Sequence, residues 1–280
     1  MENGITIKNK LSEYADWLKS EEKCPGTIDK YLRDIGAFAA WLGERELSKE
    51  AAAEWKEHLV EENYAPVTVN SMLASINTYC VFAELNIKIK FLKVQRSLFR
   101  EQSKELSREE YDKLIETALA AGKERLALLM ETICASGIRV SEVQYITVEA
   151  VSRGKAIVSL KGKIRTILLP GKLCKKLKKY AEKQKIASGE IFLTGSGRSL
   201  SRRQIWAEMK RLCKKAGVES SKVFPHNLRH LFATIYYRVY KDIAKLADVL
   251  GHSSVDTTRI YLMTTGKEHQ KQLEKLNLVS

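Results

Sequence analysis

Apolar residues recur at intervals of three and four through the first 95 residues, the spacing that places side chains on one face of a helix. The stripe that begins at Leu11 stops before Pro25-Gly26-Thr27, where Thr27 is expected to cap the next helix. This part of the chain holds no cluster of catalytic residue types, and its stripes predict a helical core. The predicted helices cover 11–18, 27–42, 51–62 and 66–82, which together make a four-helix unit.

The pattern changes at 96–106, a polar stretch without a clear period that is predicted to be a linker. Ser107-Arg-Glu-Glu110 then has the form of a capping box, in which Ser and Glu satisfy the first backbone amides of a helix. We therefore expect a first domain over 1–95 and a second over 107–280. Helices of the second domain are predicted over 124–136, 172–184, 202–216, 226–240, 243–250 and 257–262, with a short amphipathic helix over 267–278.

One stretch of the second domain has the pattern of a β-hairpin. Residues 155–160 and 164–169 are rich in β-forming side chains and flank Lys161-Gly162-Lys163, and Pro170-Gly171 closes the second run. A basic turn is therefore expected at the hairpin tip. The expected fold class is mainly α with a small antiparallel β-sheet.

Composition is that of a soluble globular protein, with 44% hydrophobic and 29% charged residues. No stretch approaches the apolar length of a membrane helix, and the amino terminus lacks the apolar core of a signal peptide. The five cysteines are scattered and lack Cys-x-x-Cys spacing, so neither a disulfide framework nor a metal site is expected. These features predict a cytoplasmic protein with no membrane partner.

The net charge of +14 predicts a polyanionic partner, and its distribution is uneven. Residues 1–95 contain 12 Lys+Arg and 15 Asp+Glu, which leaves 36 basic and 19 acidic residues in the remainder. All the positive excess lies beyond residue 95. If the partner carries phosphates, the second domain is expected to supply most of the electrostatic attraction.

Two motifs near the carboxyl end carry candidate chemistry. Tyr261 follows His252 by nine residues in Leu-Gly-His-Ser-Ser-Val-Asp-Thr-Thr-Arg-Ile-Tyr. Upstream, His226, Arg229 and His230 recur at helical spacing in Pro-His-Asn-Leu-Arg-His. Together they offer a nucleophile and groups that bind phosphate, which points to chemistry on a DNA phosphodiester.

A phosphate under attack needs cations that hold its non-bridging oxygens as charge builds up. Arginine suits this task because its planar guanidinium stays charged and donates two hydrogen bonds in parallel. Arg139 is a second candidate beside Arg229, since it follows a helix break in Ala-Ser-Gly-Ile-Arg-Val-Ser-Glu, with Glu142 three residues later. The site would thus contain at least two arginines.

Proton transfer is the other requirement, because a tyrosine must lose a proton and the leaving 5′ oxygen must gain one. His226 and Lys161 are the candidates for these transfers, and His252 is expected to donate to a phosphate oxygen. Attack by Tyr261 would give a covalent phosphotyrosine that stores the bond energy. No metal and no nucleotide cofactor would be needed.

Each residue taken alone also has an ordinary structural interpretation. Arg139 could pair with Glu142 on a helix surface, His252 could cap a turn, and Tyr261 could belong to the core. The hairpin lysines could be simple turn residues. The ordered set is what favours the catalytic interpretation.

With these motifs in this order, the chain resembles the tyrosine recombinases of the phage integrase and Xer type over nearly its whole length. The resemblance implies a two-domain, C-shaped clamp with a helical core-binding domain over 1–95 and a catalytic domain over 107–280. Lys163 is a rival to Lys161 as the general acid, because the hairpin turn is shorter than is usual in that family. Glu142 and His230 would support the site. The implied catalytic residues are Arg139, Lys161, His226, Arg229, His252 and Tyr261.

The resemblance also implies a double-stranded DNA recombination site as the partner. Four protomers would hold two duplexes and exchange strands through a Holliday junction, as a homo-tetramer or as a hetero-tetramer with a related recombinase. Arg202, Arg203 and Gln204, with Lys163, are candidate DNA contacts, since arginine and glutamine can read guanine and adenine edges. Arg202, Arg203 and Gln204 could equally be a solvated helix start.

Three functions follow from these residues. The leading one is site-specific recombination, as in integration and excision, inversion or dimer resolution. A type IB topoisomerase uses similar residues, but the small helical first domain and the lack of long insertions argue against it. A DNA-binding regulator that no longer cuts is the third, and the intact set of residues argues against that. A metal-dependent nuclease would need clustered carboxylates, which the sequence lacks.

Overall fold

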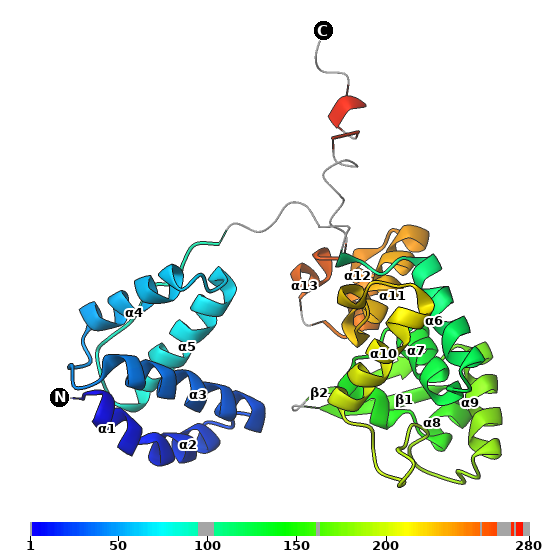
Figure 1. Cartoon of the computed structure of the whole chain (residues 1–280), viewed down its shortest axis with the longest axis horizontal. Helices are drawn as coiled ribbons and strands as arrows, with labels where there is room; N and C mark the ends of the chain where they lie inside the picture. The colour runs from blue at the N-terminus through cyan, green and yellow to red at the C-terminus, as the bar shows by residue number, and fades with distance from the viewer. Residues whose placement is uncertain are drawn as a thin grey trace. The chain divides into compact units, whose positions relative to one another are not determined.

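The computed structural model describes residues 2–94, 104–160, 163–252, 254–261, 270–271 and 273–276, apart from the side chains at 160 and 163. The chain divides into two compact units, Met1–Arg96 and Ser97–Ser280 (Figure 1). The predicted linker at 96–106 lies mostly outside the described residues, as does much of the predicted tail helix at 267–278. Each unit has a hydrophobic core of its own.

The first unit is helical, as predicted, but it has one more helix than the sequence pattern indicated. A short amino-terminal helix was missed because six residues are too few to show a clear apolar period. Its Asn3 side chain caps the helix by accepting a hydrogen bond from the Thr6 amide at 2.9 Å. The helices of this unit are α1 (Gly4–Asn9), α2 (Leu11–Ser20), α3 (Pro25–Leu42), α4 (Lys49–Glu61) and α5 (Pro66–Phe82).

The expected cap at Thr27 is wrong. Helix α3 starts two residues earlier, at Pro25, with Cys24 as the residue that precedes it. Proline suits the first helical position because its ring fixes a helical φ and its missing N–H would have had no partner there. The Pro-Gly pair therefore opens the helix instead of separating two elements.

Two asparagines of α5 hold the segment that leaves this unit. The Asn77 side chain accepts from the Ile89 amide at 2.8 Å and donates to the Ile89 carbonyl at 3.1 Å. Asn70 makes the same pair of bonds with Leu92, at 2.7 and 3.0 Å. The segment therefore runs antiparallel to α5, and its backbone groups are satisfied by side-chain amides in place of a neighbouring strand.

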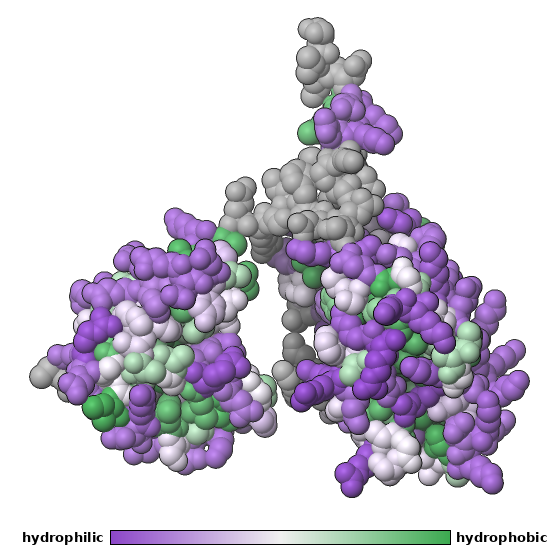
Figure 2. Space-filling view, in the orientation of Figure 1, coloured by the Kyte–Doolittle hydropathy of each residue, from purple (hydrophilic) through white to green (hydrophobic). Residues whose placement is uncertain are grey.

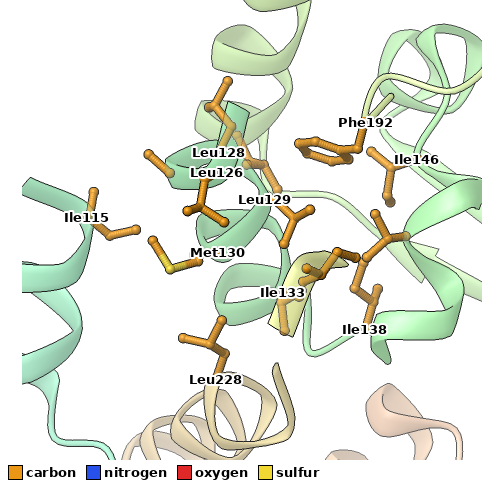
Figure 3. Packing of buried hydrophobic residues seen from close by; sticks show 14 of the residues in the cluster. Ile115, Leu126, Leu128, Leu129, Met130, Ile133, Ile138, Ile146, Phe192 and Leu228 are labelled. Atoms are coloured by element: carbon orange, nitrogen blue, oxygen red, sulfur yellow. The ribbon is translucent and has the colours of Figure 1, made fainter. Parts of the chain in front are cut away.

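The second unit surrounds α7 (Glu124–Ser136), most of which is buried. Helix α7 packs against α6 (Arg108–Ala120), α9 (Gly171–Lys183), α10 (Arg202–Ala216) and α11 (Pro225–Tyr240). Figure 3 shows Leu129, Met130 and Ile133 of this helix in the centre of the core, with Phe192 and Leu228 around them. Most sides of α7 therefore carry apolar residues, and the partly exposed Glu124 and Glu131 share the remaining side.

Strands β1 (Lys155–Leu160) and β2 (Lys163–Leu168) pair antiparallel, with Lys155 opposite Leu168 and Leu160 opposite Lys163. The predicted hairpin and the mainly α fold class are thereby confirmed. Short elements on either side were not predicted, because one or two turns carry little periodicity. They are the 3₁₀ helices η2 (Val140–Tyr145) and η3 (Ser220–Lys222) and the helix α8 (Val148–Arg153).

Helix α11 is followed by α12 (Ile243–Leu250) and α13 (Val255–Arg259). Helix α12 has the predicted bounds. The helix expected at 257–262 instead starts at Val255, where Ser254 caps it, and ends at Arg259. Tyr261 therefore lies in the turn after α13, and its amide donates to the Thr258 carbonyl at 3.0 Å.

The outer surface carries mainly polar side chains. The face seen in Figure 2 is largely hydrophilic on both units, with apolar areas scattered between. Among the described residues, none of the helices combines the length and the apolar character that a membrane crossing needs.

Candidate active site

The carboxyl end of α12 gathers three arginines from three different elements. Arg229 of α11 donates to the Leu250 carbonyl at 2.7 Å, and Arg165 of β2 also donates to this carbonyl. Arg139, the residue before η2, donates to the Gly251 carbonyl at 3.4 Å. The last carbonyls of a helix have no partner within it and carry partial negative charge, so they attract guanidinium groups.

Arg229 is the most enclosed of the three, with 2% of the residue exposed. Besides Leu250, its guanidinium donates to the Gly137 carbonyl at the end of α7 and to Nε2 of His252 at 3.0 Å. Burial, together with the nearby Arg139, lowers its pKa to about 10, so the group is still charged at neutral pH. A charge that is buried at this depth is tolerated because carbonyls and a ring nitrogen take its hydrogen bonds.

Glu142 is the carboxylate that pairs with this cluster. It is only 3% exposed, accepts from the Arg139 amide at 2.7 Å and its guanidinium at 3.1 Å, and forms an ion pair with Arg165. Burial alone would raise the pKa of Glu142, but the hydrogen bonds from Arg139 and Arg165 outweigh burial and hold the pKa below its usual value. One carboxylate against three guanidiniums leaves a local excess of positive charge, which suits a phosphate.

Arg165 was missed by the sequence interpretation, although a signal was present. It lies opposite Val158 in the hairpin, and Val158 and Ile167 on the same side of the sheet are buried. An arginine on the apolar face of a two-stranded sheet needs a partner inside the protein.

His252 lies between Arg229 and α13. Its Nε2 is 3.0 Å from Nη2 of Arg229, and its Nδ1 is 2.9 Å from Oγ1 of Thr258. Burial and the positive charges of Arg229, Arg139 and Arg165 lower the pKa of His252 to about 4. The ring is therefore neutral at neutral pH.

Tyr261 is buried against the same residues, with 4% exposed. Its ring meets the His230 ring edge-on at a centroid distance of 4.7 Å and lies nearly parallel to the His252 ring at 5.9 Å. Its hydroxyl is close enough to Arg229 to favour the charged guanidinium through a hydrogen bond. The candidate nucleophile thus lies in the arginine cluster of its own chain, and it also belongs to a small core with Leu246 and Leu250.

The two remaining histidines of the motif differ in exposure. His226 is exposed in the first turn of α11, where a proton could be exchanged with substrate or solvent. His230 is buried, and its Nδ1 is 3.3 Å from the Thr234 hydroxyl. Its contact with the Tyr261 ring makes it a support for that side chain.

Of the two candidate general acids, Lys161 lies outside the described residues. Lys163 is the first residue of β2, and its side chain is not described. Arg202 and Arg203 are exposed at the start of α10. Gln204 completes a capping box, in which its side-chain oxygen Oε1 accepts a hydrogen bond from the Ser201 backbone amide at 2.9 Å. Reading adenine with both amide atoms would require this cap to open, which weighs against Gln204 as a base contact.

Trp206, one turn further along α10, was not singled out from the sequence. It is 48% exposed, and the Lys210 ammonium lies 5.3 Å from the centre of its ring. An exposed aromatic face can stack on a base and a neighbouring ammonium group can contact a phosphate, so α10 offers a further candidate contact for DNA.

Gly251 has a backbone that only glycine adopts easily, and it touches Arg165. Its φ is +63°, and a Cβ there would lie 2.5 Å from Nη1 of Arg165. We expect Gly251→Ala to lower the free energy of unfolding by about 1–2 kcal/mol through backbone strain alone. The displacement of Arg165 should lower it further. Gly217 is a matched control because it has the same φ of +63° with nothing within 4 Å.

Thermal unfolding midpoints of both variants measure this difference. Gly251→Ala should unfold at a lower temperature than Gly217→Ala, because only the former pushes Arg165 away from Leu250. Equal midpoints would show that Arg165 adapts without loss.

The low pKa of His252 predicts a pH dependence of stability. In the unfolded chain the ring has an ordinary pKa of 6.5, whereas in the folded protein it is about 4. Between these values the unfolded state binds more protons, so stability is highest above pH 6.5 and falls as the pH approaches 4. His252→Gln should lose less stability than the wild type between pH 7 and pH 5, as measured by urea unfolding. Parallel pH curves for the two proteins would contradict the prediction.

Two family models match the chain. The model described as "Phage integrase family" matches residues 104–268, and the one described as "Phage integrase, N-terminal SAM-like domain" matches residues 11–86. The first match alone covers more than half of the chain and includes all the site residues described above.

Similar proteins and structures agree with these matches. Tyrosine recombinase XerA of Thermococcus kodakarensis is 30% identical over 279 residues, which cover 96% of this chain and 95% of the relative. A crystal structure of XerH bound to a palindromic difH substrate has a TM-score of 0.74 at 19% identity and covers 95% of this chain and 84% of the other. A lambda integrase tetramer bound to a Holliday junction gives 0.70 at 20% identity, with 90% and 76% covered. At these identities the two structures show a shared fold.

Proposed function

Because the chain belongs to the phage integrase family and is a tyrosine-type site-specific DNA recombinase, we propose that it cuts and rejoins DNA through a bond between Tyr261 and a 3′ phosphate. The observation that carries this proposal is the convergence of Arg139, Arg229 and His252 beside the Tyr261 ring. These groups come from separate elements, and together they offer positive charge and a nucleophile.

In the proposed reaction, the scissile phosphate binds at the exposed side of the cluster. Arg139 is the accessible guanidinium, with 42% of its side chain exposed, and Arg229 lies behind it. Both donate hydrogen bonds to the non-bridging oxygens as negative charge grows in the transition state. Glu142 and Arg165 hold Arg139 and the end of α12 in place, which preorganises the donors.

The Tyr261 oxygen forms a bond to phosphorus, and the bond to the 5′ oxygen breaks. His226 is the proposed acceptor of the tyrosine proton, and Lys161 or Lys163 gives a proton to the 5′ oxygen. The reverse reaction, with the 5′ hydroxyl of another strand as the nucleophile, rejoins the DNA. The phosphotyrosine conserves the bond energy, so these residues suffice without a nucleotide cofactor.

We further propose that four copies of this chain act on two duplexes in the cytoplasm. A tetrameric arrangement is supported by the fold shared with the lambda integrase that was crystallised as a tetramer on a Holliday junction. The five free cysteines fit a reducing compartment. Recombination of two sites by the purified chain alone would support a homo-tetramer, and a strict need for a second recombinase would contradict it.

The test of the cutting reaction is a denaturing gel with a suicide DNA substrate made from the sequence that flanks the gene of this chain, in buffer without Mg²⁺. A protein band linked to the 3′ phosphate is the expected result. DNA binding without any such band would favour the non-cutting regulator over the recombinase.

A further inference from the structure

Thr258 contacts His252 but has no part in the proposed reaction as described above. Its side chain is completely buried, and its Oγ1 lies 2.9 Å from Nδ1 of His252, six residues earlier in the chain. A threonine in a helix often bonds a carbonyl one turn back. Here the hydroxyl bonds a histidine ring, which connects α13 to the arginine cluster.

The hydrogen bonds of His252 fix which ring nitrogen carries the proton. Arginine can only donate, so Nε2, at 3.0 Å from Arg229, must be the acceptor. In the neutral ring the proton then lies on Nδ1, and the Thr258 hydroxyl must accept it. Arg229 thus sets the tautomer, and Thr258 supplies the acceptor that holds the ring with Nε2 directed at Arg229.

The same residue is tied to the nucleophile. The Thr258 carbonyl accepts from the Tyr261 amide at 3.0 Å, so one turn of chain links the partner of His252 to Tyr261. A displacement of α13 would therefore move Thr258 and Tyr261 together. It would remove the acceptor of His252 at the same time as the nucleophile.

We propose that Thr258 is a positioning residue that keeps Nε2 of His252 directed at the bound phosphate and does so only when α13 holds Tyr261 in the site. This inference rests on the proposed function. If a phosphate takes over the hydrogen bonds of Arg229 and His252 gains a proton from solvent, Nδ1–H still donates to Thr258 and Nε2–H donates to the phosphate. The ring needs no rotation, because its Nδ1 partner is the same in both protonation states.

The charged and titratable groups around His252 are consistent with this role. Arg229 of α11, Arg139 before η2 and Arg165 of β2 all disfavour a proton on the ring, as does His226. A phosphate would offset these charges. Tyr261 stacks on the ring from the side of α13.

The test compares three variants of the full chain. Thr258→Val removes the hydroxyl but keeps the shape, Thr258→Ser keeps the hydroxyl, and Thr257→Val is the control because Thr257 is exposed in the same helix. We expect Thr258→Val to slow formation of the covalent band by roughly 10- to 100-fold, by analogy with the loss of a partner that orients a metal-ligating histidine. DNA affinity should stay within about twofold, because Thr258 is buried and contributes no charge that contacts phosphate. Thr258→Ser and Thr257→Val should both cut at nearly the wild-type rate.

A second measurement needs no cutting. ¹⁵N NMR of the histidine rings in the free protein should show His252 protonated on Nδ1 in the wild type and in Thr258→Ser. Thr258→Val should weaken this tautomer preference, because the Nδ1 proton then has lost its acceptor while Arg229 still donates to Nε2. The spectrum of the wild type alone would overturn the inference if His252 were protonated on Nε2, whether or not the valine variant folds.

The outcomes separate this inference from the proposed function. A wild type that never forms the covalent band contradicts the proposed function, while the NMR result still reports on the Thr258 bond. A wild type that cuts, with Thr258→Val equally fast, overturns the role of Thr258 alone. Equal slowing in Thr258→Val and Thr258→Ser would also overturn it, since packing and not the hydroxyl would then be responsible.

Discussion

Replacing Tyr261 with Phe is expected to abolish covalent capture of DNA and to leave DNA affinity within about twofold of the wild type, because the hydroxyl adds no charge to the phosphate contacts. The aromatic ring packs against His230 and His252, and phenylalanine preserves these contacts. The loss is therefore confined to the attacking oxygen. The measurement is the denaturing gel with a suicide substrate, run beside a binding assay at the same salt concentration.

The control for this variant is Tyr240→Phe. Tyr240 is exposed at the end of α11, so loss of its hydroxyl should leave both cutting and binding unchanged. A covalent band that persists in Tyr261→Phe would place the nucleophile on another residue. The nearby Tyr236 and Tyr237 would then be the next to replace, since both pack against the same small core.

Replacing Arg229 with Lys is expected to reduce the rate of cutting by about 10²–10³-fold, the effect of removing one preorganised donor from a transition state. The guanidinium donates at once to Gly137, Leu250 and His252. A single ammonium group cannot reproduce this planar set of directions. Arg229→Ala should impair cutting at least as much, but it also leaves buried carbonyls without donors, so the lysine variant separates catalysis from folding more clearly.

Arg238→Lys is the matched control, because Arg238 is an exposed arginine of the same helix. It should cut at the wild-type rate. The measurement compares the single-turnover rates at which the two variants cut the suicide substrate. Thermal unfolding checks that both variants are folded. A rate for Arg229→Lys within threefold of the wild type would show that Arg229 is structural and that Arg139 bears the transition-state charge.

Sequence periodicity predicted the long helices and the hairpin because each long element has a clear apolar side or alternation. The predictions were wrong where one local pattern is compatible with two structures. Pro25 can end one element or begin the next, and the choice depends on packing that the pattern does not contain. Helix α1 is too short to show a period, and it is held by Asn3 and by a close approach of Gly4 to α3.

The candidate residues of the site could be found from motifs, but their arrangement could not. Arg229 is held by the backbone carbonyls at the ends of α7 and α12. Any residue type would supply these carbonyls, so no sequence motif predicts the two contacts. Arg165 is the plainest example. Its partners are Glu142 and two backbone carbonyls at the end of α12, and only the alternation of the strand indicates that it points inward.

The hydrogen bonds of Asn70 and Asn77 fix the number of residues between their two backbone partners, Ile89 and Leu92. Seven residues of helix rise about 10.5 Å between the two amides, and three extended residues from Ile89 to Leu92 cover about 10 Å. One inserted residue would add about 3.3 Å and turn the following side chains to the opposite face, so only one asparagine could stay engaged. An insertion or deletion between Ile89 and Leu92 would therefore break one of the two pairs of hydrogen bonds, whereas a change of length outside that interval would leave both pairs in place.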